Sequence, residues 1–141
     1  MGKSEKIVDQ YVKAYEKRNQ EIINSFLDSK YFYYPPGGGK PMSREERIRD
    51  EAFFFSAFSK IRTRIVEKVV EGNKMACRIT MRCTHSGDYQ GVAATNKRVK
   101  IIYMEILLMK HGKILKEWAE FDLLSILNQL KLDHATQQTK S

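Results

Sequence analysis

Three ionisable side chains fall on the predicted apolar faces of strands. His85 ends the apolar face of one predicted strand, Glu105 interrupts that of another, and Asp122 closes the last. A buried charge is costly unless it is compensated, so each residue needs a partner, a shifted pKa or a polar cavity. If they converge, a carboxylate and an imidazole in an aromatic pocket can remove an acidic C–H proton and stabilise the enolate oxygen. We therefore take Asp122 as the candidate base and His85 as its assisting group.

Each of these residues also has a purely structural interpretation, and the sequence leaves the alternatives open. His85 could be a satisfied hydrogen-bond partner at the end of a strand. Glu105 could form an ion pair with Arg78 or Arg82. Asp122 could be the N-cap of the closing helix, because aspartate is a preferred residue at that position.

Aromatic residues could complete a ligand pocket around these groups. Trp118 lies four residues before Asp122 and on the same predicted face, where its ring could exclude water or form a flat wall for a ligand. Core packing is the common role of a lone tryptophan. Tyr33 and Tyr103 could add hydroxyl groups to the cavity, and Glu105 is its candidate wall.

The elements that must position these residues are helices first and strands afterwards. Ser43 and Glu46 form a capping box that starts a helix rich in phenylalanine. From Ile61 the apolar period changes to two, which is typical of strands. We expect a first helix capped by Ser4, which Asn19 interrupts or caps again before a second apolar stripe that ends at Leu27. Further helices are expected over 43–58 and 123–130, a short strand over 31–34, and strands over 61–70, 75–85, 99–110 and 114–122.

This order predicts an α+β fold, because a group of helices is followed by a run of antiparallel strands. One strongly curved sheet wrapped around the N-terminal helices would bury the apolar stripes and leave a pocket between them. We expect a single domain over residues 1–132 and a polar C-terminal tail over 133–141.

Composition and charge exclude several classes of protein. The 141 residues carry a formal net charge of +8, with 42% hydrophobic and 30% charged residues, which is ordinary for a globular chain and excludes wholesale disorder. We see neither a membrane span nor a secretory signal, and expect a cytoplasmic protein. Acidic residues are interspersed among the basic ones, so we expect a solvated basic surface and no nucleic-acid binding.

The motifs of the common cofactors are missing from the sequence. We find no P-loop, dinucleotide fingerprint, nucleophile elbow or zinc spacing, and expect neither a metal ion nor an organic cofactor. Cys77 and Cys83 lie in one predicted strand, about 20 Å apart at roughly 3.3 Å per residue. They cannot pair within the subunit and are expected to be reduced core thiols.

The stretch from Thr84 onward resembles the SnoaL-like polyketide cyclase family, within the superfamily shaped like nuclear transport factor 2. The matching residues lie in two groups, on the second half of the chain. They are Thr84-His85-x-Gly87-x-Tyr89-x-Gly91, Thr95 and Lys97, then Glu105, Gly112-Lys113-Ile114, Glu117-Trp118, Asp122 and Gln129-Leu130. The loop departs from the family pattern, since Asn96 stands where a glycine is usual, although asparagine can also adopt a positive φ.

The resemblance implies a cone-shaped sheet packed on helices around a hydrophobic pocket, in a homodimer. It implies that Asp122 is the general acid/base of an intramolecular aldol ring closure, that His85 assists it, and that no cofactor takes part. Our leading hypothesis is a cofactor-free cyclase or isomerase acting on a small hydrophobic or aromatic molecule that contains a carbonyl group. The alternative is a non-catalytic ligand-binding or dimerisation module of the same fold.

Overall fold

The computed structural model describes residues 2–140, with side chains described as far as residue 131. Its helices precede the sheet, separate two of its strands and close the chain. In chain order they are α1 (Lys3–Ala14), the 3₁₀ turn η1 (Tyr15–Lys17), α2 (Gln20–Ser25), the turn η2 (Pro36–Gly38), α3 (Arg44–Ala57) and α4 (Leu123–Lys140).

Six strands form a single sheet in the order β2-β1-β6-β5-β4-β3. All neighbouring strands are antiparallel except β1 and β6, which run parallel. The strands are β1 (Leu27–Tyr34), β2 (Met42–Ser43), β3 (Phe58–Glu71), β4 (Lys74–His85), β5 (Arg98–Lys110) and β6 (Lys113–Phe121). The predicted α+β class, with N-terminal helices and a mostly antiparallel sheet, is confirmed.

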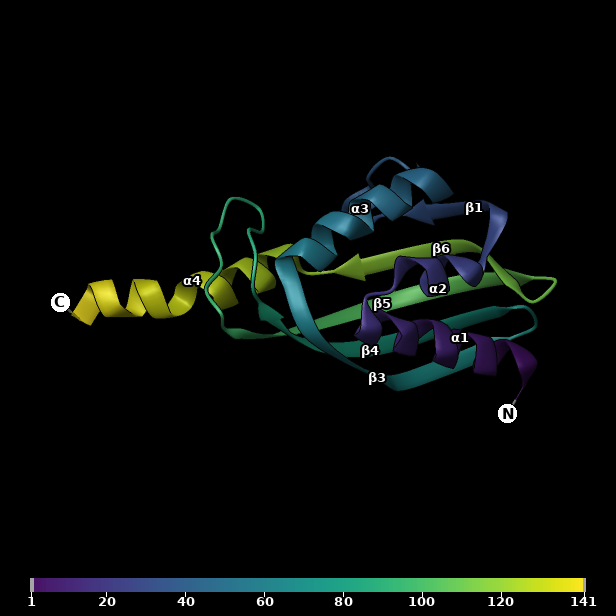
Figure 1. Ribbon diagram of the computed structural model, residues 1–141. Coiled ribbons are helices and arrows are strands. Elements are labelled where there is room, and N and C mark those ends of the chain that lie inside the picture. Colours follow the sequence, from purple (N-terminus) through teal and green to yellow (C-terminus); the bar gives the residue numbers. More distant parts are fainter. Residues whose placement is uncertain (1, 141) are drawn as a thin grey trace.

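The helices α1, α2 and α3 lie on one side of the sheet, which we call its inner face (Figure 1). The pairing of β3 with β4 shifts between Ser59 and Arg62 and again between Ile65 and Glu67. Such bulges bend a strand and increase its twist, which lets a long sheet curve around the helices. Alternate residues of β4 from Met75 to His85 are buried on the inner face, as the period of two predicts.

Local signals in the sequence correctly predict several element boundaries. The hydroxyl oxygen of Ser43 accepts a hydrogen bond from the Glu46 amide, and the Glu46 carboxylate accepts one from the Ser43 amide. The side chain of Asn19 caps α2. In the loop before β5, Asn96 has a φ of 60°, so the turn survives without a glycine.

The two cysteines are unpaired and buried, as expected for residues of one strand. Burial raises the pKa of each thiol to about 12. Both thiols therefore behave as small apolar groups of the core.

The two ends of the chain differ from the expected pattern. α1 begins at Lys3 with Gly2 as its N-cap residue, so Ser4 lies inside the helix. α4 continues to Lys140, through the segment expected to form a polar tail. The boundary at residue 132 stays a prediction. Among the described residues, no helix is long and apolar enough to span a membrane.

The inward-facing residues of β6 differ from those expected. The pairing of β5 with β6 shifts between Leu108 and Met109, whose partners are Lys116 and Ile114. This irregularity buries Ile114, Glu117 and Ala119, whereas an uninterrupted period of two from Ile114 selects Trp118. The prediction that Trp118 continues the inner face is wrong for this reason.

Candidate functional site

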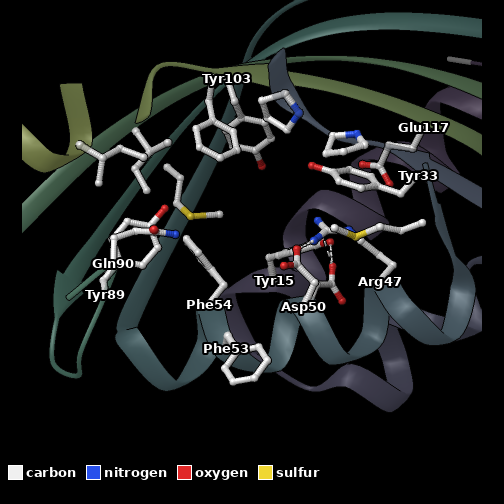
Figure 2. Close-up of a pocket in the computed structure, with 18 of the residues that line it drawn as sticks. Tyr15, Tyr33, Arg47, Asp50, Phe53, Phe54, Tyr89, Gln90, Tyr103 and Glu117 are labelled. Carbon is white, nitrogen blue, oxygen red and sulfur yellow. Dashed lines mark hydrogen bonds and ion pairs between the residues drawn. The ribbon is translucent and has the colours of Figure 1, made fainter. Parts of the chain in front are cut away.

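A pocket of about 500 Å³ lies between α3 and the inner face of the sheet (Figure 2). Aromatic and aliphatic side chains form most of its wall, with a set of ionisable groups among them. Its lining residues include Tyr15, Tyr33, Met42, Phe53, Phe54, Met81, Tyr89, Ile101, Tyr103 and Phe121, and the ionisable Arg47, Asp50, Glu51, Asp88, Glu105 and Glu117.

Four parts of the fold bring these groups together. β5 contributes Tyr103 and Glu105, which are two residues apart and therefore face the same side of the sheet. β6 contributes Glu117, and α3 contributes Arg47 and Glu51 at a spacing of one helical turn. The loop between β4 and β5 adds Asp88 and Tyr89. The pocket therefore depends on contacts between distant parts of the sequence.

Glu117 is an acid of the pocket held by two tyrosine hydroxyls. Its side chain is buried, and Oε1 accepts hydrogen bonds from the hydroxyls of Tyr11 at 2.8 Å and Tyr31 at 2.6 Å. Burial raises the pKa of Glu117, while the Arg47 guanidinium and the two tyrosine bonds partly oppose that change. The carboxyl group therefore holds its proton to a higher pH than an exposed glutamate.

A second group of polar residues is connected to Glu117 through the hydroxyls of Tyr11 and Tyr15. That hydroxyl lies 3.2 Å from the Tyr11 hydroxyl and donates a hydrogen bond to Glu51 Oε2. Arg47 makes ion pairs with Glu51 at 3.4 Å and Asp50 at 3.1 Å. We call Tyr11, Tyr15, Tyr31, Glu51 and Glu117 the carboxyl–tyrosine cluster.

The tyrosines of this cluster act as neutral hydrogen-bond donors. Burial is the largest cause that raises the pKa of Tyr11, Tyr15 and Tyr31, and the neighbouring carboxylates raise it further. Their hydroxyls therefore remain protonated over the working pH range of most proteins.

Glu105 is buried but uncompensated. Its side chain lines the pocket, the residue is 5% exposed, and Oε2 has no hydrogen-bond partner in the described part of the chain. The predicted ion pair with Arg78 or Arg82 is wrong, because both arginines alternate onto the opposite face of β4. Arg78 pairs instead with Glu67 at 2.7 Å.

Two of the tyrosines predicted from the sequence line the same pocket as Glu105. Figure 2 shows the hydroxyl ends of Tyr33 and Tyr103 pointing into one space. Burial raises the pKa of Tyr33 to about 12 and raises that of Tyr103 as well. The guanidinium carbon of Arg47 lies 3.9 Å from the centre of the Tyr33 ring. Both hydroxyls are therefore neutral donors that a bound oxygen atom can use.

His85 is fully buried and does not belong to the pocket lining. Its Nδ1 lies 2.9 Å from the Thr95 hydroxyl and accepts a hydrogen bond from the Thr95 amide at 3.2 Å. The ring packs against Phe58, which in turn contacts the pocket residue Tyr89. Burial lowers the pKa of His85, so the ring is neutral at pH 7. Its part in catalysis stays a prediction.

Asp122 is exposed at the start of α4, next to the pocket residue Phe121. Its Oδ1 accepts a hydrogen bond from the Ser125 amide at 3.2 Å, which confirms the N-cap contact left open by the sequence. The structure does not bring Asp122 and His85 together in the lining of the pocket. Trp118 also lies outside that lining and stacks on Tyr34, with 5.0 Å between ring centres.

We expect Asp122→Ala to lower the free energy of unfolding by about 1 kcal/mol, because it removes the side-chain acceptor of an N-cap. Asp122→Asn retains an acceptor and should unfold close to the wild type. Urea unfolding followed by circular dichroism measures both variants. Equal stability of Asp122→Ala and wild type would show that the cap contributes nothing.

Sequence reasoning missed Glu117, Glu51 and Arg47. Glu117 was hidden by the irregular pairing of β6. A signal for the other two does exist, because Arg47, Glu51 and Phe55 follow one another at a spacing of four residues. Such a spacing places them along one side of a helix whose Phe55 is buried. In the described residues, no group of three or more potential ligands could hold a metal ion.

Comparisons with known proteins identify the family and the fold. A family model described as SnoaL-like polyketide cyclase matches residues 5–130. None of the curated proteins matches the chain.

Solved structures with the same fold share little sequence with this chain. AclR from Streptomyces galilaeus, a proposed hydroxylase, is 21% identical, with a TM-score of 0.83 over 90% of this chain and 94% of that one. IdmH from Streptomyces antibioticus, a proposed polyketide cyclase, is also 21% identical, with a TM-score of 0.80 over 90% and 97%. A protein of ketosteroid-isomerase-like fold from Catenulispora acidiphila, in complex with trimethylamine, is 15% identical, with a TM-score of 0.72 over 87% and 90%. At these sequence identities the structural similarity establishes the fold alone.

Proposed function

This chain belongs to the SnoaL-like polyketide cyclase family, and we propose that its pocket binds a small hydrophobic or aromatic carbonyl compound and transfers a proton at the carbon next to the carbonyl group. Glu117 is the proposed acid/base group. The observation that carries the proposal is a buried carboxyl group with a raised pKa on the wall of an aromatic pocket. A raised pKa suits an acid/base group that must both accept and release a proton near neutral pH.

The proposed step uses only side chains of the pocket. The Glu117 carboxylate takes the proton as the C–H bond breaks, and the electron pair moves onto the carbonyl oxygen. The neutral hydroxyls of Tyr33 and Tyr103 donate to that oxygen as its negative charge develops. Donors that are already fixed in place stabilise such a charge without reorganising. The resulting enolate can be reprotonated, as in an isomerase, or can attack a second carbonyl group of the same molecule, as in a cyclase.

The family resemblance supports a different pair of catalytic residues, Asp122 and His85. The position of Asp122 beside Phe121, which lines the pocket, favours this assignment. The exposed side chain of Asp122 and the bonds between His85 and Thr95 favour Glu117. Asp122→Asn separates the two assignments, because it preserves the helix cap and removes the carboxylate.

Hydrogen–deuterium exchange tests the proposal without knowledge of the natural substrate. The protein is incubated in D₂O with 1-indanone or 2-tetralone, and the loss of the α-proton signals is followed by ¹H NMR. We expect exchange that exceeds the buffer rate and saturates with ketone concentration. Binding of the ketones without exchange would favour the non-catalytic ligand-binding alternative, and absence of both would contradict the proposal.

A homodimer and a cytoplasmic location belong to the same proposal. The exposed side chains of Ile102, Met104 and Ile106, which form an apolar row on the outer face of β5, support the homodimer. The cytoplasmic location stays a prediction from the sequence.

A further inference from the structure

The charge of the pocket is opposite to that of the whole chain. The protein has a formal net charge of +8, yet its pocket is lined by five acidic side chains and a single arginine. Asp50 and Asp88 are exposed and lie at the rim, whereas Glu51, Glu105 and Glu117 are buried inside. A recess lined by one sign of charge concentrates ligands of the other sign.

The arginine compensates only part of this acidic lining. Arg47 is already engaged by Glu51 and Asp50, at 3.4 and 3.1 Å. Glu117 accepts two tyrosine hydrogen bonds. Glu105 is therefore the buried acid of the pocket that has no compensating group among the described residues.

The surroundings of Glu105 indicate that its partner comes from outside the chain. Glu105 is only 5% exposed and lines the cavity. Its Oε2 atom has no hydrogen-bond partner among the described residues. The residues paired with Glu105 on the two neighbouring strands are Cys77, whose thiol is a weak donor, and Ala119, which has no polar side chain. An isolated buried carboxylate is costly, and a bound cation would remove that cost.

The aromatic wall suits a cation as well. Tyr33, Phe54, Tyr89 and Tyr103 line the same space, and the negative face of an aromatic ring attracts a cation within about 6 Å. The Tyr33 ring already holds the Arg47 guanidinium at 3.9 Å from its centre. Carboxylates with aromatic rings form the type of site that recognises alkylammonium groups.

We infer that the molecule bound in this pocket carries a positively charged nitrogen, an alkylammonium group, whose counter-ion is Glu105. The inference rests on the proposed function, since it assigns a charge to the carbonyl compound proposed above. It predicts that Glu105 selects the ligand and that Glu117 transfers the proton.

A pair of probes of nearly equal shape isolates the effect of the charge. Choline and 3,3-dimethylbutan-1-ol differ in the atom that bears the methyl groups, a charged nitrogen in one and a neutral carbon in the other. Binding of each to the full chain is measured by NMR titration at fixed low ionic strength. We expect choline to bind at least about tenfold more tightly, within the range of desolvated cation–aromatic contacts.

Glu105→Gln should reduce choline binding about tenfold and leave the alcohol unaffected. Glu71→Gln is the matched control, because it removes the same charge from an exposed strand end outside the pocket. Circular dichroism establishes that each variant is folded, and the comparison of the two probes on wild-type protein stands even if Glu105→Gln does not fold.

The inference is overturned if choline binds no better than the alcohol, or if a folded Glu105→Gln variant retains wild-type affinity for choline. The ketone exchange assay distinguishes this failure from that of the proposed function. Exchange without a preference for choline contradicts the charged ligand alone, and absence of exchange contradicts the proposed proton transfer.

Discussion

Glu117→Gln is expected to lower the rate of deuterium exchange into the bound ketone by about 10²–10⁴-fold, the usual contribution of a general acid/base group. Glutamine has the size of glutamate but cannot accept the α-proton. Its amide oxygen can still accept the hydrogen bonds that Tyr11 and Tyr31 donate to Oε1. The affinity for the ketone, measured by NMR titration, should therefore change little while exchange is lost.

Glu120→Gln is the matched control for this variant. Glu120 lies on the same strand, is exposed and does not line the pocket, so its replacement should leave exchange unchanged. If Glu117→Gln exchanges deuterium into the ketone at the wild-type rate and Asp122→Asn does not, the acid/base group is Asp122 and not Glu117.

Glu117→Gln should also change the dependence of stability on pH. Burial raises the pKa of Glu117 in the folded state, so folding favours the protonated form. This contribution to stability is fully present below the pKa of the unfolded chain, and it is lost as the pH rises through the folded pKa. Glutamine stays neutral, so the variant should gain stability relative to wild type as the pH rises from about 4 to 7. Thermal melts at a series of pH values measure the difference, and a constant difference would contradict burial as the cause.

Gly87→Ala is expected to destabilise the protein by about 3 kcal/mol, the upper end of the usual cost of overpacking. A Cβ atom at this position would overlap the carbonyl oxygen of Ser56 and lie 3.1 Å from its carbon. These are backbone atoms at the end of α3, which cannot move aside as a flexible side chain can. The amide of Gly87 also donates to the carbonyl oxygen of Ala57 at 3.0 Å, which holds the loop against the helix.

The loss should extend to ligand binding, because the displaced loop carries the pocket residues Asp88 and Tyr89. Gly2→Ala is the control for steric overlap, since a Cβ atom there would meet open space and the variant should lose only the preference for glycine at the N-cap of α1. Chemical denaturation gives the free energies of unfolding, and NMR titration with choline gives the binding. Unchanged stability of Gly87→Ala would mean that the loop and α3 can separate without cost.

Glu105 could be predicted from the sequence because it is the charged exception in a strand that is otherwise apolar on both faces between Ile101 and Met109. Tyr33 and Tyr103 could be predicted because tyrosine combines an apolar ring with a polar end. Glu117 could not, because a shift in the pairing of β6 moves the inward-facing positions by one residue. A single extra residue in a strand reverses the face of every side chain beyond it. The alternation of apolar residues does not reveal where such a shift occurs.

The sequence predicts the burial of His85 but not its hydrogen-bond partner. The end of an apolar strand face correctly indicated that the imidazole is buried. Its partner, Thr95, comes from the irregular loop before β5, where no periodicity applies. For Asp122, the sequence identified the capping role as an alternative, and the position of the side chain depends on how α4 leaves the sheet.

The carboxyl–tyrosine cluster has four oxygen–oxygen contacts, but its three tyrosine hydroxyls bring only three hydrogen atoms. Four contacts join its members: Tyr11 with Tyr15, Tyr11 with Glu117, Tyr31 with Glu117, and Tyr15 with Glu51. Each hydrogen bond contains one hydrogen atom, and three tyrosines bring three. All three hydroxyls donate to the two carboxyl groups, so no hydroxyl hydrogen is left for the 3.2 Å contact between Tyr11 and Tyr15. Because the charge of Glu51 raises the pKa of Glu117, a replacement that removes this charge should make Glu117 more acidic, although the two residues lie on different elements.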